Sequence, residues 1–89
     1  MKFEWSEEKR LWTLEDRALD FRDAGLLFDG RPLYTYPSPR EEEARFESVG
    51  STGRHCIAVI WMEREGVRRI ISMRRAWHAE ERALRSLYE

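Results

Sequence analysis

Residues 55–76 hold two long β-type runs joined by a short turn, and this pair constrains the fold most. The first run, HCIAVIWM at 55–62, is short, apolar and rich in β-branched residues, which indicates a strand buried on both faces. The second run, VRRIISMRRA at 67–76, follows Glu65-Gly66, a dipeptide that suits a two-residue hairpin turn. We therefore expect an antiparallel hairpin at the centre of a sheet.

The register of this hairpin divides its side chains between two faces, because side chains alternate along a strand. One face holds Ala58, Ile60, Met62, Arg69, Ile71 and Met73, and the other holds Ile57, Val59, Trp61, Glu63, Arg68, Ile70, Ser72 and Arg74. We expect the first face to pack under the helices and the second to form a partly open, cationic surface. An odd-length turn would scramble this division. Arg69 and Arg74 lie on opposite faces of a regular strand, so both can line one groove only if a bulge or the strand end redirects one.

The rest of the chain predicts an α+β fold with a small antiparallel sheet. Residues 2–5 alternate like a short strand, and Ser6 is an N-cap for a helix that runs to about Arg17. Asp20 begins a second short helix, so that an N-terminal helical hairpin is expected. Strands at 32–36 and 44–49 precede the central hairpin, and prolines mark the first of them as an edge strand. A C-terminal helix at 77–88 completes the order β-α-α-β-β-β-β-α.

Length and composition fit one folded domain over residues 1–89. The chain has 89 residues, of which 42% are hydrophobic and 12% aromatic, so it can bury a single core. It shows no apolar run of membrane-spanning length and no signal peptide, and we expect a cytoplasmic protein. The single cysteine, Cys56, begins an apolar run and is interpreted as a core thiol.

Charge is distributed unevenly along the chain. The formal net charge of −1 excludes a protein that is basic overall, but residues 1–45 carry −3 and residues 46–89 carry +2. Arginine supplies 14 of the 16 basic side chains, and its planar fork suits phosphate and carboxylate groups. A GC-rich codon bias would explain the same excess without any functional role.

The strongest chemical signal is an arginine set that surrounds the second hairpin strand. Phosphate contacts need several positioned cations, and Trp61 or Trp77 could stack a nucleic-acid base. The alternative interpretation is that these arginines only make the surface soluble and pair with neighbouring glutamates. No metal-ligand spacing or glycine-rich phosphate loop is present, so we expect neither a metal nor another cofactor. The histidines, His55 and His78, are interpreted as surface or capping residues. The arginine set is Arg64, Arg68, Arg69, Arg74 and Arg75.

The chain also resembles the BrnT family of toxins from bacterial type II toxin–antitoxin modules, over nearly its full length. The most specific match is Arg69-Ile70-Ile71-Ser72-x-Arg74-Arg75-Ala76, followed by Glu80. The other matching pieces, in order, are Phe3-x-Trp5, Lys9, Asp20-Phe21-x-Asp23-Ala24, Phe28-Asp29, Pro39-Arg40, Arg45-Phe46 and Gly50. The resemblance lies in the order and spacing of these pieces.

This resemblance implies a RelE-like fold and a ribonuclease that arrests translation and growth. A ribbon-helix-helix antitoxin of the BrnA type would neutralise the toxin in a heterotetramer and repress the shared operon, so that DNA is contacted only through the antitoxin. Ribonucleases of this kind commonly use the ribose 2′-hydroxyl as nucleophile without a metal. The protein then orients the RNA, assists proton transfer and stabilises the charged transition state.

Site residues follow from the positions that match. The resemblance implies catalytic roles for Lys9, Arg64, Arg69, Arg74 and Glu80, and Ser72 would orient the RNA through its hydroxyl. The RNA-binding residues are then Arg68, Ser72, Arg75 and Trp61.

The chain departs from the family pattern at three places. Ser6 stands where the family has Asp, Asp16-Arg17-Ala18 replaces Lys-His-Gly, and Met73 replaces a small residue. Loss of the Lys-His pair removes a cation and a possible acid–base group, and Arg17 stays protonated. The alternative function is therefore binding of an antitoxin-like partner or RNA without cleavage.

Overall fold

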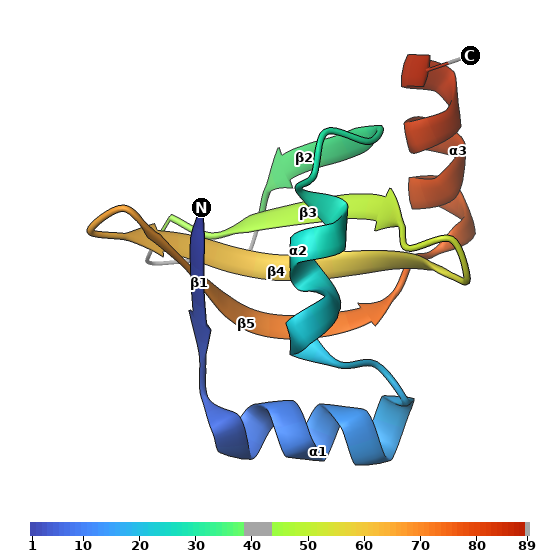
Figure 1. Cartoon of the computed structure of the whole chain (residues 1–89). Helices are drawn as coiled ribbons and strands as arrows, with labels where there is room; N and C mark the ends of the chain where they lie inside the picture. The colour runs from blue at the N-terminus through green and yellow to red at the C-terminus, as the bar shows by residue number, and fades with distance from the viewer. Residues whose placement is uncertain (39–43, 89) are drawn as a thin grey trace.

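The protein forms a sheet with short helices on its faces, as seen in a computed structural model that describes residues 1–38 and 44–88 (Figure 1). The order of helices and strands agrees with the sequence prediction. The elements are β1 (Lys2–Trp5), α1 (Glu7–Arg17), a 3₁₀ turn (Phe21–Asp23), α2 (Ala24–Leu27), β2 (Leu33–Pro37), β3 (Phe46–Ser51), β4 (Cys56–Arg64), β5 (Val67–Arg75) and α3 (His78–Tyr88). The matching piece Pro39-Arg40 lies outside the described residues.

The sheet has five strands in the order β1-β5-β4-β3-β2 and is mixed, which corrects the prediction of a purely antiparallel sheet. Strands β2 to β5 pair antiparallel, but β1 runs parallel to β5, with Lys2 opposite Val67 and Trp5 opposite Ile70. The alternation in residues 2–5 predicts a strand, but it carries no information on the partner of that strand or on its direction. The prediction that β2 is an edge strand is confirmed.

Both helix starts in the first third of the chain follow the predicted caps. The Ser6 side chain accepts a hydrogen bond from the Lys9 N–H, and the Asp20 side chain accepts one from the Arg22 N–H. Ala18 ends α1 with φ of 58°, a left-handed conformation that an L-residue other than glycine adopts at a cost. The second helix is only one turn long, and in Figure 1 it stands above α1 and runs in a different direction, so the predicted helical hairpin is not confirmed.

The central hairpin forms as predicted around Glu65-Gly66. Arg64 pairs with Val67, and both turn residues have positive φ, 52° for Glu65 and 80° for Gly66. Two positive φ values in a two-residue loop match the twist of the flanking strands, which favours this turn over the common types. The register of the first half of β5 is therefore the one expected from the sequence.

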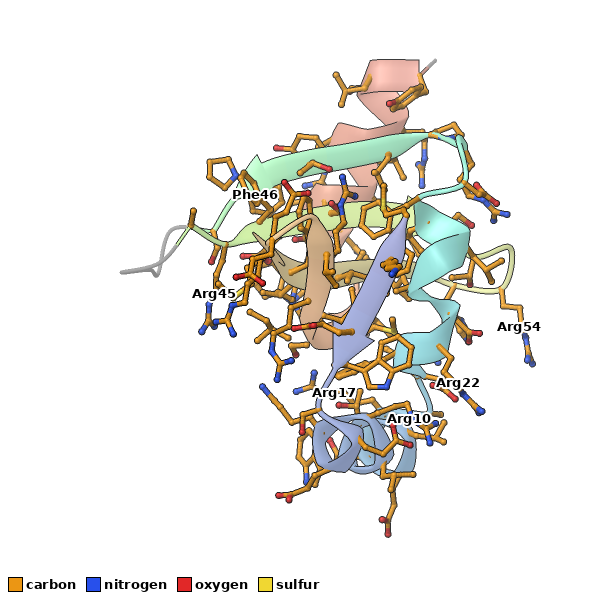
Figure 2. All side chains as sticks on the ribbon, turned by 60° about the vertical axis from the view of Figure 1, so that its left-hand side comes forward. Arg10, Arg17, Arg22, Arg45, Phe46 and Arg54 are labelled. Carbon is orange, nitrogen blue, oxygen red and sulfur yellow. The ribbon has the colours of Figure 1, made fainter. Side chains whose placement is uncertain are left out.

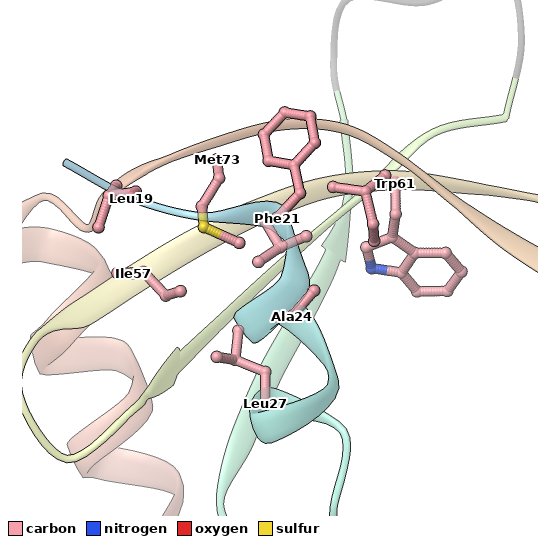
Figure 3. Packing of buried hydrophobic residues seen from close by; sticks show 9 residues of the cluster. Leu19, Phe21, Ala24, Leu27, Ile57, Trp61 and Met73 are labelled. Carbon is pink, nitrogen blue, oxygen red and sulfur yellow. The ribbon is translucent and has the colours of Figure 1, made fainter. Parts of the chain in front are cut away.

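The prediction of which hairpin face packs under the helices is wrong. Trp61 and Ile70, which the alternation assigns to the open face, join a buried cluster with Phe21 and Leu27 from the helical segment (Figure 3). Met73, which the alternation assigns to the packed face, is buried in the same cluster, as predicted. Both sets of side chains are apolar enough to form a core, so the pattern alone did not determine the choice. The larger side chains of the set that contains Trp61 fill the space under α2. The face with Ala58, Ile60 and Met62 is the one that stays partly open.

A β-bulge in β5 changes the second half of this assignment. Ile60 pairs with Ser72 and Trp61 pairs with Ile70, so Ile71 is an extra residue without a partner in the ladder. Because of this extra residue, each later residue of β5 points to the opposite face from the one expected for a regular strand. Arg74, which pairs with Ala58, therefore lies on the same face as Arg69, which pairs with Met62.

Candidate nucleic-acid interface

Two adjoining hollows occupy the partly open face of the sheet. The larger has a volume of about 660 Å³ and the smaller about 230 Å³, and both are lined by Arg45 and Ile71. Figure 2 shows Arg45 at the side of the molecule opposite Arg54. The larger hollow is also lined by Arg17, Tyr36, Ser38, Glu47, Ile60, Ser72, Arg74 and Trp77. The smaller is also lined by Ser6, Lys9, Met62, Arg64, Arg69 and Ile70.

The smaller hollow, which we call the basic hollow, carries three of the predicted catalytic cations. Lys9 comes from the first turn of α1, and Arg64 and Arg69 come from opposite strands of the hairpin next to its turn. Arg69 donates to Glu4 at 3.0 Å, an ion pair whose side chains are 35% and 41% exposed. Exposed pairs of this kind are weak, so the guanidinium can exchange this carboxylate for a phosphate.

Arg74 and Glu80 form a buried ion pair beside the larger hollow. We call this larger hollow the acidic-arginine hollow. The Arg74 guanidinium donates to both oxygens of Glu80, at 2.8 and 2.9 Å, and also to Glu47 at 2.8 Å. A fourth bond reaches the Arg75 carbonyl at 3.2 Å. These four bonds match the four N–H groups on the two terminal nitrogens, so Arg74 would have to give up a bond to contact a phosphate through them. The bonds to Glu80 raise the pKa of Arg74 still further above its ordinary value.

The oxygens of Glu80 are also fully hydrogen-bonded, because its side chain caps the start of α3 as well as binding Arg74. One oxygen accepts from the Trp77 N–H at 2.8 Å, which is the reach-back of a capping box, and the other accepts from the Tyr36 hydroxyl. Burial opposes ionisation of this carboxyl, but the bonds from Arg74, Tyr36 and Trp77 outweigh it and lower the pKa of Glu80 to about 2. With both oxygens fully occupied, Glu80 is suited to hold Arg74 and poorly suited to accept a proton.

Glu47 is a residue of this hollow that the sequence analysis missed. It lies on β3 opposite Tyr36 of β2 and Ile60 of β4, so its side chain shares the open face with theirs. One oxygen accepts from Arg74 at 2.8 Å and lies 3.1 Å from the Tyr36 hydroxyl. The only available signal was the alternation of residues 44–49, which cannot show that a carboxylate faces the arginine strand.

Arg17 enters the same hollow from the end of α1. Its guanidinium donates to the Met73 carbonyl at 2.8 Å and lies 3.5 Å from the Ser72 hydroxyl. The bond to Met73 ties α1 to the strand just after the bulge. Arg17 thus supplies a cation to this hollow, and Ser72 lies beside it on the open face.

Three predicted RNA-binding residues lie away from the two hollows. Trp61 is 7% exposed within the core, and the Arg68 guanidinium stacks on its ring at 4.1 Å. Arg75 pairs with Ile57 on the core side and bonds the His55 ring at 2.9 Å. The exposed aromatic surface at the hollows is Trp77, which is 61% exposed and has Arg74 at 3.9 Å from its ring centre.

The described residues offer neither a metal centre nor a membrane segment. Across residues 1–38 and 44–88, no group of three or more His, Cys, Asp or Glu side chains is placed to hold a metal ion. None of the helices in these ranges is long and apolar enough to cross a membrane. The acidic residues 41–43 lie outside the described part of the chain.

Comparison with known proteins shows which family the chain belongs to. None of the curated proteins compared with the chain matches it. The model of one protein family, described as the ribonuclease toxin BrnT of type II toxin–antitoxin systems, matches residues 5–80. This match includes all the described residues that line the two hollows, from Ser6 to Trp77, and also Glu80. The chain therefore belongs to the BrnT family of ribonuclease toxins from type II toxin–antitoxin systems.

Proposed function

We propose that the chain acts as one domain with a RelE-like fold and cleaves RNA through the ribose 2′-hydroxyl, without a metal. The observation that carries this proposal is the bulge at Ile71. It puts Arg69, Ser72 and Arg74 on one open face, where a regular strand would separate Arg69 from Arg74. An extended RNA needs cations and polar groups on a single surface, so this arrangement supports RNA binding there.

The two hollows would contact different parts of a bound RNA. The basic hollow would hold backbone phosphates with Lys9, Arg64 and Arg69, because guanidinium and ammonium groups bind phosphate oxygens with charge-assisted hydrogen bonds. The exposed face of Trp77 would stack a base at the far end, a contact of about 1–3 kcal/mol. Between them, Arg17 would face the phosphate that reacts.

The proposed reaction is attack of a 2′-hydroxyl on the adjacent phosphate, which leaves a 2′,3′-cyclic phosphate and a 5′-hydroxyl. The transition state carries extra negative charge on the phosphate oxygens, and a fixed cation lowers its energy more than that of the substrate. We assign this role to Arg69 and Arg17. Arg74 and Glu80 hold the wall of the hollow, and Ser72 orients the RNA.

Membership of a toxin–antitoxin family implies an antitoxin partner. We propose a ribbon-helix-helix antitoxin that covers the open face in a heterotetramer and contacts the operator DNA itself. RNA cleavage in the cytoplasm would then stop translation and growth when the antitoxin is lost.

A second function, binding of RNA or an antitoxin without cleavage, is favoured by one observation. Arg74 and Glu80, two of the predicted catalytic residues, already satisfy each other and their neighbours. Together with Arg17 in place of histidine, this reduces the groups that can move protons. The same experiment distinguishes the two functions.

The test combines a growth assay with an RNA-cleavage assay on the purified chain in EDTA. Wild type should stop growth when expressed without a partner and should leave RNA fragments with 2′,3′-cyclic phosphate ends. Arg69→Ala should lose at least tenfold in cleavage rate. Arg54→Ala is the matched control, since Arg54 is exposed on the opposite side of the molecule (Figure 2) and should cleave as wild type does. Tight RNA or antitoxin binding with no cleavage would favour the second function.

A further inference from the structure

We propose that Glu47 is the general base that removes the 2′-hydroxyl proton of the RNA. This inference rests on the proposed ribonuclease function and names a catalytic group for it. It starts from the carboxylates of the open face, since the described residues lining the two hollows include one carboxylate, Glu47.

The position of Glu47 suits a base. It lies within β3, held between Tyr36 of β2 and Ile60 of β4, so its backbone is fixed by strands on both sides. Its side chain is 12% exposed, which keeps it largely out of bulk water while it still lines the hollow. A base of this kind must reach its proton within hydrogen-bond distance of the substrate, and a hollow of about 660 Å³ can admit a nucleotide.

The hydrogen bonds leave one oxygen of Glu47 available. Oε1 is engaged by Arg74 and Tyr36, whereas Oε2 has no partner among the described residues. Oε2 is also not fully buried, and the Glu47 side chain lines the hollow. Glu80 differs in this respect, because both of its oxygens accept two bonds each.

The charged and titratable groups around Glu47 come from every neighbouring element. Arg74 of β5 fixes Oε1, and Glu80 of α3 lies on the far side of Arg74. Burial and the bond to Glu80 raise the pKa of Tyr36, which therefore keeps its proton. Arg17 of α1 and Arg45, next to β3, line the same hollow and would attract the phosphate toward Glu47.

The step balances without a cofactor. The Glu47 carboxylate takes the proton of the 2′-hydroxyl while the 2′-oxygen forms a bond to phosphorus. The bond from phosphorus to the 5′-oxygen breaks, and this oxygen takes a proton from water. The Glu47 carboxyl then returns its proton to the hydroxide, so that the net products are the cyclic phosphate and a free 5′-hydroxyl.

The test compares Glu47→Gln with wild type on an RNA substrate in EDTA. Glutamine keeps the size and can still accept from Arg74, but it cannot take a proton. We expect a 10²- to 10⁴-fold lower cleavage rate, the range typical of a lost general base. Affinity for a 2′-O-methyl RNA, which binds but cannot react, should stay within threefold. The acidic limb of the pH–rate profile should also disappear.

Two further variants keep the test informative. Glu63→Gln, a carboxylate of β4 on the other face of the sheet, should cleave as wild type does. Glu47→Asp should lower the rate but retain the acidic limb, and it serves as the test if the glutamine variant does not fold.

The outcomes separate this inference from the proposed function. A wild-type chain that does not cleave RNA in EDTA overturns both. Cleavage by Glu47→Gln within threefold of wild type overturns the role of Glu47 alone. A parallel loss of RNA affinity and rate, with the pH profile unchanged, would make Glu47 structural and would also overturn it.

Discussion

Replacing Glu80 with glutamine tests whether the buried ion pair organises the open face. The Glu80 side chain is 7% exposed, and it connects β5, β2 and the start of α3 through Arg74, Tyr36 and Trp77. Glutamine has one oxygen in place of two and adds an NH₂ group that would face other donors. The variant therefore removes a charge partner and leaves donors unsatisfied at the same point.

The size of the effect follows from the pKa of Glu80. Its fall from 4.5 to about 2, at about 1.4 kcal/mol per unit, corresponds to about 3 kcal/mol of stability. Since this pKa is lowered by folding, the contribution is complete above about pH 5 and is lost as the pH falls toward 2. We expect Glu80→Gln to lower the free energy of unfolding by about 2–3 kcal/mol at pH 7.

Urea unfolding at pH 7, 5, 4 and 3 measures this directly. The stability difference between wild type and Glu80→Gln should shrink by about 2 kcal/mol between pH 7 and pH 3, because wild type loses what the variant already lacks. Glu81→Gln is the control, since the ion pair that Glu81 forms with Arg85 is long, at 3.9 Å, and its loss should change stability by less than about 0.5 kcal/mol. A stability difference that is the same at every pH would show that the lowered pKa of Glu80 does not stabilise the fold.

Three other changes test separate parts of the fold. Ala18→Gly should stabilise the chain by about 0.5–1 kcal/mol and raise its Tm by several degrees, since Ala18 has φ of 58°; an unchanged or lower Tm would contradict this. The raised pKa of Tyr36 predicts that stability falls as the pH rises above about 10, less steeply in Tyr36→Phe, and absorbance at 295 nm should show this phenol ionising only on unfolding. Deletion of Ile71 should remove the bulge but keep Ser72 opposite Ile60 and Arg74 opposite Ala58, so the chain should stay folded and keep binding RNA; an unfolded circular dichroism spectrum would count against the bulge.

The sequence predicted those parts of the fold that depend on neighbouring residues. The turn at Glu65-Gly66, the caps at Ser6 and Asp20 and the edge strand β2 all follow from local chemistry, and all are confirmed. The parallel pairing of β1 with β5 joins residues more than sixty positions apart, and no local pattern contains it.

The open face was harder to predict because it depends on one unpaired residue. Nothing in Ile70-Ile71 marks a bulge, yet this residue decides whether Arg69 and Arg74 share a face. The saturation of Arg74 is likewise invisible in sequence, since its partner Glu47 comes from a strand 27 residues earlier. The sequence therefore predicted several of the cations that line the two hollows, but it did not predict that Glu47 lines one of them.

The most direct test of the account asks which face of the molecule contacts RNA. Two tryptophans are similarly exposed, Trp77 at 61% beside the acidic-arginine hollow and Trp12 at 56% on α1. A 2′-O-methyl RNA with a photoreactive uridine can be crosslinked to the purified chain, and mass spectrometry can locate the crosslinks. We expect crosslinks at Trp77 and within the two hollows, and these should disappear in Arg69→Ala. Crosslinks confined to Trp12, with none on the open face, would contradict it.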